Sequence, residues 1–102
     1  MTYARRVDGN HASMKGHFER LGCAVHDASR AGGGFPDLVV SLHKQTVLVE
    51  IKDPTKPKAD QQLTPDQVKF HREWKGVIYE ARTLDDVIAI VGEMKRVMKM
   101  FQ

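Results

Sequence analysis

The chain has 102 residues, 41% hydrophobic and 28% charged, with a formal net charge of +3. This length suits one domain with a real core, placed at residues 1–102, and the composition is that of a soluble globular protein. A single cysteine, Cys23, excludes an intramolecular disulfide, and no apolar run approaches the roughly 18 residues of a membrane span. We therefore expect a cytoplasmic protein without a membrane partner, whose mildly basic surface is compatible with a polyanion.

A helix and a short strand are the first predicted elements. Apolar or part-apolar side chains recur over residues 7–21 with the spacing of one helix face, and Gly22 ends this helix. Residues 23–28 are predicted to form the strand, with Cys23 as a small core residue. The following loop, residues 29–35, contains three consecutive glycines, which leave no side chain to block the close approach of another group.

Residues 38–52 are predicted to form two apolar strands joined by a three-residue polar connection, and such strands pair as an antiparallel hairpin. With the apex at the centre of this connection, Asp37 at the start of the hairpin falls opposite Ile51. Glu50 and Lys52 share one face of the second strand, because strand side chains alternate between faces. Asp37 is thereby expected between these two charged side chains.

An irregular loop and a second helix follow the hairpin. Two prolines among mostly polar residues make 53–63 the exposed loop. The helix is predicted over residues 65–75, with Thr64 as N-cap, Pro65 at the first helical position and Gln67 placed to complete a capping box.

A fourth strand at residues 77–81 and a helix capped by Thr83 complete the chain. Since a helix joins the third and fourth strands, we expect them to be parallel, while the first three form an antiparallel meander. The last helix has a broad apolar stripe, which either packs in the core or binds a second copy of the chain, or does both: Leu84, Val87, Ile88, Val91, Met94, Met98 and Phe101.

The charged residues of the hairpin suggest a metal site. Burial of an unpaired charge is costly, and Mg²⁺ is commonly held by one or two carboxylates. Asp37 and Glu50 supply carboxylates, and the main-chain carbonyl of Ile51 lies between them as a third oxygen. A metal there lowers the pKa of a water, and Lys52 is suited to hold that water or to stabilise developing charge. The alternative is that these charges mark a solvated sheet edge.

Three segments carry a family resemblance: Gly34-Phe35-Pro36-Asp37, Val49-Glu50-Ile51-Lys52-Asp53 and Leu63-Thr64-Pro65-Asp66-Gln67. Together they resemble the PD-(D/E)XK nuclease superfamily, and most closely the VRR-Nuc domain in the small, stand-alone form of bacteria and their phages. Residues 5–11 and 70–76 are similar to phage-type members as well. The resemblance implies an α/β fold, with a restriction-endonuclease-like αβββαβ core, a mixed sheet flanked by helices, and an extra C-terminal helix.

The resemblance also implies roles for individual residues. Asp37 and Glu50 would bind the metal, Lys52 would be the catalytic lysine, and Gln67 would face the site, although the capping box gives Gln67 a second explanation. Many relatives carry a glutamate on the first helix that assists with metal or water. The chain has none there.

Asn10 or His11 is expected to take the place of that glutamate, and Asp8 is a weaker substitute because it can equally cap the helix. Exposed basic residues near the site are expected to contact DNA phosphates, and such contacts weaken steeply with salt: Arg30, Lys56, Lys58, Lys69 and Arg72.

The function so implied is that of a Mg²⁺-dependent endodeoxyribonuclease, for which Mn²⁺ can substitute. By resemblance it would cut branched DNA, above all four-way (Holliday) junctions, as a homodimer in a bacterial or phage-infected cell. Three alternatives stay open. They are a nuclease-fold DNA-binding protein with weak or lost catalysis, a structure-specific flap nuclease, and an interaction module in which the charges are only surface residues.

Overall fold

The computed structural model describes residues 10–100. Its α-helices and strands follow the order expected from the sequence: α1 (His11–Arg20), β1 (Ala24–Asp27), β2 (Leu38–Leu42), β3 (Gln45–Ile51), α2 (Pro65–Glu73), β4 (Ile78–Ala81) and α3 (Leu84–Met100). The loop predicted to be irregular, residues 53–63, contains in addition the 3₁₀ helix η1 (Lys58–Gln61). The first residues of the predicted N-terminal helix, including Asp8, lie outside the described part of the chain, as does Phe101.

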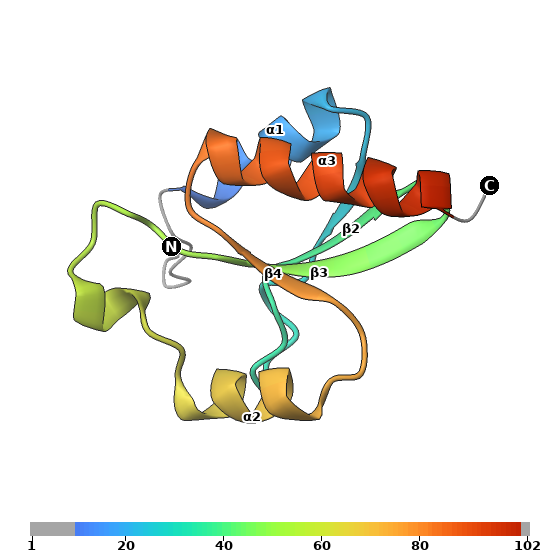
Figure 1. Ribbon diagram of the computed structural model, residues 1–102. Helices are drawn as coiled ribbons and strands as arrows, with labels where there is room; N and C mark the ends of the chain where they lie inside the picture. The colour runs from blue at the N-terminus through green and yellow to red at the C-terminus, as the bar shows by residue number, and fades with distance from the viewer. Residues whose placement is uncertain (1–9, 101–102) are drawn as a thin grey trace.

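The four strands form one mixed sheet in the order β1-β2-β3-β4. The first three are antiparallel neighbours and β4 runs parallel to β3, as the predicted meander and crossover require. Helices α1 and α3 lie side by side over one face of the sheet, and α2 lies on the other side (Figure 1). The α/β fold with a C-terminal helix is therefore confirmed. No helix in the described part of the chain is long and apolar enough to cross a membrane.

The hairpin register differs by one residue from the expected one. Its turn has two residues, His43 and Lys44, both with left-handed φ (51° and 68°), so Leu42 pairs with Gln45. Continuing this register, Asp37 lies opposite Glu50 rather than Ile51. Opposite residues of an antiparallel pair point to the same face, so the expected register would have put Asp37 on the wrong face. The observed one brings both carboxylates together.

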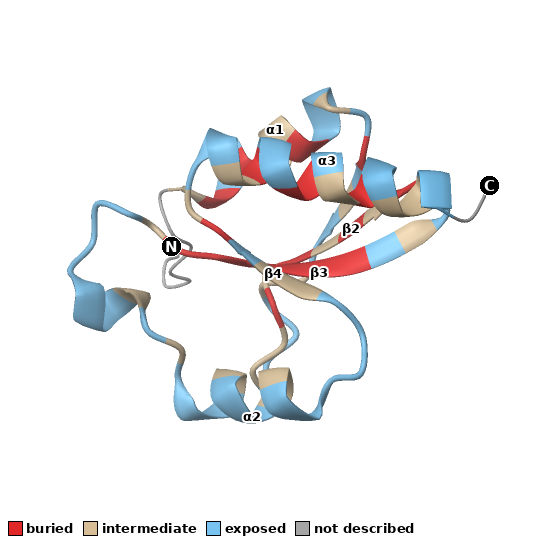
Figure 2. Cartoon of the chain, in the orientation of Figure 1, coloured by how far each residue is buried: buried red, intermediate tan, exposed pale blue. Residues whose placement is uncertain are grey.

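The core fills the space between the sheet and the helices α1 and α3 (Figure 2). Alternate strand residues and one face of each helix contribute to it: Leu38, Val40, Leu42, Val47, Val49, Ile51, Met14, Phe18, Val87, Ile90, Val91 and Met94. Cys23 is buried there as predicted, and burial raises the pKa of its thiol.

The predicted stripe of α3 is only partly correct. Val87, Val91 and Met94 are buried, but Leu84 and Ile88 are 46% and 50% exposed, and Ile90 is buried instead. The apolar residues of this helix span more of its circumference than the sheet and α1 cover. Leu84 and Ile88, one turn apart, therefore remain on the surface.

Helix α2 is attached by its ends rather than by a buried face. Of its nine residues, none is buried (Figure 2). It is held by an aromatic cluster in which Phe70 stacks on Trp74 (ring centroids 5.2 Å apart) and Phe35 meets both rings edge-on. Trp74 remains 43% exposed despite these contacts, so the cluster lies at the surface and not in the core.

Gly34 is the position where the glycine-rich loop meets α2. Its φ is +81°, and a Cβ there would lie 2.3 Å from the main-chain oxygen of Asp66. The neighbouring Gly33 also has positive φ (+64°), but a Cβ there meets nothing within 4 Å. Gly34 thus allows the first turn of α2 to approach the loop that leads into β2.

We expect Gly34→Ala to destabilise the protein more than Gly33→Ala. Both substitutions place alanine at a left-handed φ, which costs about 1–2 kcal/mol. Gly34→Ala also forces a side chain into backbone, and overpacking typically adds about 1–3 kcal/mol. Urea unfolding of the two variants measures the difference. Equal losses would show that α2 does not need this approach.

Candidate active site

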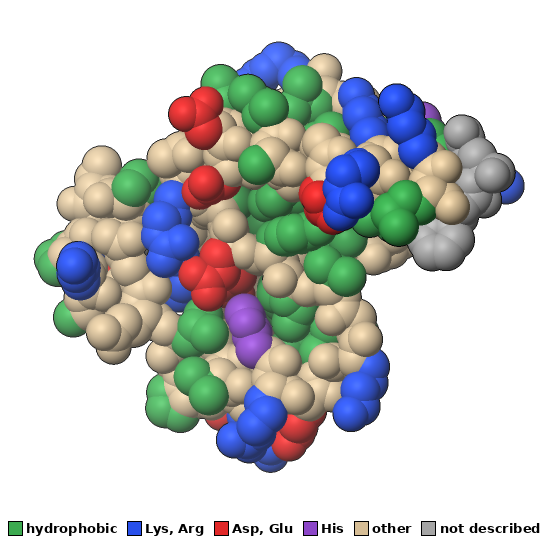
Figure 3. Space-filling model, in the orientation of Figure 1, with side chains coloured by type: hydrophobic (Ala, Val, Ile, Leu, Met, Phe, Trp, Pro, Cys, Tyr) green, Lys and Arg blue, Asp and Glu red, His purple; other side chains and the backbone are tan. Residues whose placement is uncertain are grey.

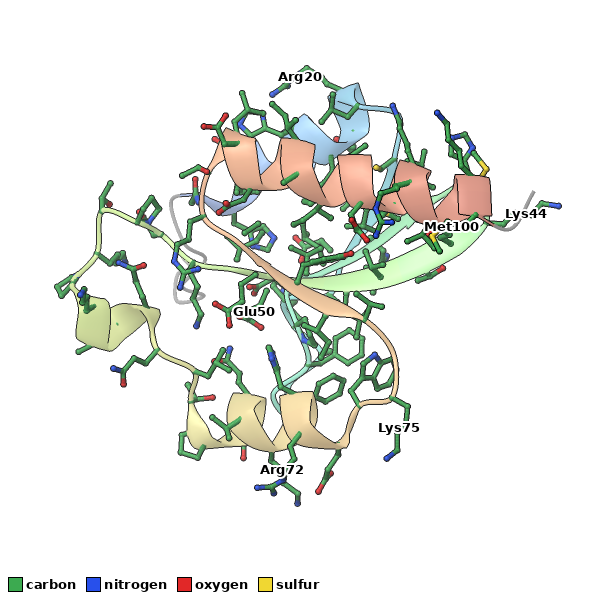
Figure 4. The ribbon with its side chains drawn as sticks, in the orientation of Figure 1. Arg20, Lys44, Glu50, Arg72, Lys75 and Met100 are labelled. Carbon is green, nitrogen blue, oxygen red and sulfur yellow. The ribbon has the colours of Figure 1, made fainter. Side chains whose placement is uncertain are left out.

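The site lies where β3 ends, on the face of the sheet that looks toward α2. Glu50 and Lys52 are almost fully buried, 2% and 6% exposed. They border a cavity of about 240 Å³ lined by His11, Ser29, Asp37, Glu50, Ile51, Lys52, Asp60, Gln62, Thr64 and Gln67. Figure 4 shows Glu50 between the strands and α2, and Figure 3 shows the molecule hollowed between these parts.

Five residues predicted from the hairpin and α2, together with His11, thus share one cavity. Asn10 is not among its lining residues. The predicted phosphate contacts do not line it either: Arg30, Lys56, Lys58, Lys69 and Arg72 are all exposed. Arg72 lies on the side of α2 turned away from Glu50 (Figure 4), which removes it from the immediate surroundings of the cavity.

The two carboxylates are held by different partners. The Ile51 N–H donates to Oδ2 of Asp37 (2.8 Å), and Nε2 of Gln67 donates to Oε2 of Glu50 (3.0 Å). The second oxygen of Glu50, Oε1, is buried without a hydrogen-bond partner. Burial, together with the charge and a hydrogen bond of Asp37, raises the pKa of Glu50 to about 8, although the Lys52 ammonium opposes the shift.

Gln67 combines the two roles that the sequence left open. Its Oε1 accepts from the Thr64 N–H (2.9 Å), while the Gln67 N–H donates to Oγ1 of Thr64 (3.2 Å), which completes the predicted capping box. Its Nε2 is then free to reach Glu50. The cap therefore fixes the orientation of the amide that contacts the site.

Lys52 is fixed by its main chain as well as by its side chain. Its N–H donates to the carbonyl of Ala81 (3.1 Å), its carbonyl accepts from Nδ2 of Asn10 (3.2 Å), and Nζ donates to the carbonyl of Gln62 (3.3 Å). The last contact ties the loop over residues 53–63 to the site. The ammonium faces the carboxylates without being confined to them.

His11 is the first-helix residue that reaches the cavity. It is 5% exposed, and its Nε2 lies 3.3 Å from Oδ2 of Asp27. The other oxygen of Asp27 accepts from the N–H (2.9 Å) and the hydroxyl (2.7 Å) of Ser29. These hydrogen bonds hold the pKa of Asp27 below its ordinary value.

Sequence reasoning missed Asp27 and Ser29. The available signal was an aspartate at the end of a strand followed two residues later by serine, a pattern typical of an Asx turn. That pattern identifies the turn, but not the histidine from another element that meets it.

The donor set fits a divalent cation. Glu50 Oε1 lacks a hydrogen-bond partner, and burial together with the neighbouring Asp37 carboxyl raises the pKa of Glu50. A cation would satisfy the oxygen and offset both the desolvation and the repulsion. The Ile51 carbonyl points to the same edge of β3 as its N–H, which binds Asp37. Within residues 10–100 no three His, Cys, Asp or Glu side chains gather closely enough for a metal. Main-chain, water or phosphate oxygens would therefore complete the coordination.

Comparison with known proteins gives one informative result. No family model and no curated protein matches the sequence. A solved structure described as a VRR_NUC domain superposes with a TM-score of 0.62 and 26% sequence identity, and the match covers 83% of this chain and 94% of that chain. The motifs, the strand order and this structural match together support the assignment of the chain to the VRR-Nuc domains of the PD-(D/E)XK nuclease superfamily.

Proposed function

We propose that the protein is a divalent-metal-dependent endonuclease that hydrolyses phosphodiester bonds in branched DNA, with four-way junctions as its preferred substrate. The observation that carries the proposal is the buried, partnerless Oε1 of Glu50 beside Asp37, in one cavity with Lys52. Buried carboxylate oxygens in structural ion pairs are normally hydrogen-bonded, whereas a site for a cation leaves an oxygen open to bind it.

Asp37, Glu50 and the Ile51 carbonyl would hold the metal, with Mg²⁺ as the expected ion and Mn²⁺ as a substitute. When bound, the cation supplies Lewis acidity at the scissile phosphate and favours ionisation of the attacking water. Lys52 stabilises the charge that develops on the phosphate oxygens, and its low exposure strengthens this effect. Gln67 would hold Glu50 in place for the cation through the hydrogen bond from its Nε2 to Oε2 of Glu50.

His11, rather than Asn10, takes the place of the first-helix glutamate in this proposal. It lines the cavity, and its Nε2 lies 3.3 Å from Oδ2 of Asp27. Its role is to orient water or substrate beside the phosphate. The first helix can then still assist with water or substrate, although it carries no glutamate.

The DNA would approach across the open side of the cavity. Lys56 and Lys58 lie on the loop that forms one wall, Arg30 lies in the glycine-rich loop and Lys69 lies on α2. Exposed lysines at these places supply phosphate contacts that do not depend on base sequence. The protein would therefore recognise the shape of the DNA and not its base sequence.

A homodimer is part of the proposal because a two-fold substrate suits a two-fold protein. The exposed pair Leu84 and Ile88 on α3 is the apolar surface we assign to the second copy. A dimer places two cavities on one junction, so that two strands are cut in one encounter.

The test is a comparison of labelled four-way junction, 5′ flap, linear duplex and single-stranded DNA, with Mg²⁺, with Mn²⁺ and with a chelator. We expect cuts in the junction with either metal and none with the chelator. Faster cutting of the flap would make the protein a flap nuclease. Binding without cutting under every metal would make it a DNA-binding protein with lost catalysis.

A further inference from the structure

Asn10 stands at the N-cap of α1 but does not cap it. Its side chain makes no capping hydrogen bond, although asparagine is among the favoured residues for that purpose. Nδ2 instead donates to the carbonyls of Lys52 (3.2 Å) and Arg82 (2.9 Å), which are 42 and 72 positions away in sequence. The local preference of this residue gives way to two long-range contacts.

The two acceptors mark the point where parallel strands separate. The pairing of β3 with β4 ends at Ile51 and Ala81, followed by the bond from the Lys52 N–H to the Ala81 carbonyl. Beyond it the chain after β3 enters the loop and the chain after β4 enters α3. An amide –NH₂ carries two hydrogens, so Asn10 can bridge both departing main chains at once.

The bridge formed by Asn10 helps to fix the main chain of Lys52. Its N–H is bound by Ala81 and its carbonyl by Asn10, so both polar groups of its main chain are fixed. A side chain that must place one ammonium in a buried cavity depends on such a fixed origin. His11, the next residue after Asn10, enters the same cavity.

We infer that Asn10 is a positioning residue for Lys52 and not a metal ligand. Its amide holds the end of β3 against the end of β4, and thereby sets where the ammonium meets the phosphate. The inference rests on the proposed nuclease function and extends it to a residue outside the cavity.

Two substitutions separate this role from helix capping. Asn10→Asp keeps the shape and remains a favoured N-cap, but it presents oxygen to two carbonyls and donates to neither. Asn10→Ala removes both hydrogen bonds without adding charge. Gln45→Ala is the matched control, because Nε2 of Gln45 donates to the Met94 carbonyl (2.6 Å), a comparable long-range contact at the opposite end of β3.

The experiment compares the wild-type protein and these three variants well below their melting temperatures. Single-turnover cleavage of a junction at saturating Mg²⁺ gives the rate, and separate titrations give the affinities for DNA and metal. Amide hydrogen exchange at Lys52 is measured in the metal-free protein without DNA.

Both Asn10 variants should cut about 10–100-fold more slowly, because small misplacements of a catalytic group are costly. We expect their DNA and metal affinities to stay within about twofold, a range that excludes loss of a metal ligand. Exchange at Lys52 should accelerate. Gln45→Ala should lose stability while it keeps the wild-type rate and the wild-type exchange at Lys52.

An unchanged rate in Asn10→Ala, or a fall in metal affinity in place of rate, would overturn the inference. If Gln45→Ala loses as much cleavage rate as the Asn10 variants, Asn10 contributes only to stability and does not position Lys52. If the wild-type protein never cuts, the proposed function fails and the catalytic meaning of Asn10 fails with it, while exchange at Lys52 still reports whether the bridge exists.

Discussion

We expect Asp37→Asn and Lys52→Ala to abolish cleavage of a four-way junction and to leave binding of the junction intact. Asparagine keeps the shape of Asp37 and can still accept from the Ile51 N–H, so the strand end persists while the charge needed by a cation is lost. Removal of the Lys52 ammonium takes away a preorganised charge at the phosphate. Each change is expected to lower the cleavage rate by on the order of 10³-fold, as the removal of a single electrostatic stabiliser can do.

The measurement is single-turnover cleavage of a labelled junction, together with an affinity titration of the same junction in Ca²⁺ or chelator. Asp60→Asn is the control for Asp37, because Asp60 borders the same cavity but lies exposed on η1. Lys95→Ala is the control for Lys52, because Lys95 is an exposed lysine on α3, away from the cavity. If either control is as inactive as its partner, or if Asp37→Asn still cuts at near the wild-type rate, the assignment of the site is wrong.

We expect Glu50→Gln to be more stable than the wild-type protein at pH 8 and above when no metal is bound. In the folded protein burial and Asp37 raise the pKa of Glu50 from 4.5 to about 8. The folded state therefore binds the proton more tightly than the unfolded state, and the free energy of unfolding falls as the pH rises from about 4.5 to about 8. Glutamine carries no ionisable proton and lacks this slope.

The effect is expected to reach at most about 5 kcal/mol between the ends of that pH range, since each tenfold change in an ionisation constant corresponds to about 1.4 kcal/mol. Urea unfolding of both proteins with a chelator, from pH 5 to pH 9, measures it. Mg²⁺ should restore stability to the wild-type protein at pH 8 and have little effect on Glu50→Gln. Glu73→Gln, on the exposed surface of α2, should keep the wild-type slope. A wild-type stability independent of pH over this range would contradict the buried, shifted carboxyl.

The hairpin shows where sequence reasoning reached its limit. The apolar strands, their antiparallel pairing and the charges at their ends were all readable, because period-two patterns and turn chemistry are local. The register was not, because a two-residue turn with His43 and Lys44 in left-handed conformations carries no glycine or asparagine to announce it. One residue of difference decided which face Asp37 occupies.

Helix α2 shows a second limit. Its start was predicted correctly from Thr64, Pro65 and Gln67, since capping is a contact between near neighbours. Its attachment was not, because it depends on Gly34 and on an aromatic cluster with Phe35 from another part of the chain.

The sequence by itself determined the order of the helices and strands, and it carried the motifs behind the predicted cation site and the family resemblance, since all of these are local patterns or ordered motifs. Only the tertiary structure decided that Asp37 lies opposite Glu50 and that one oxygen of Glu50 has no hydrogen-bond partner. It also decided that His11 lines the cavity beside Asp27, and that Asn10 bridges the ends of β3 and β4. These features arise between segments distant along the chain, and their distances are set by the packing of the sheet and helices rather than by any neighbouring residues.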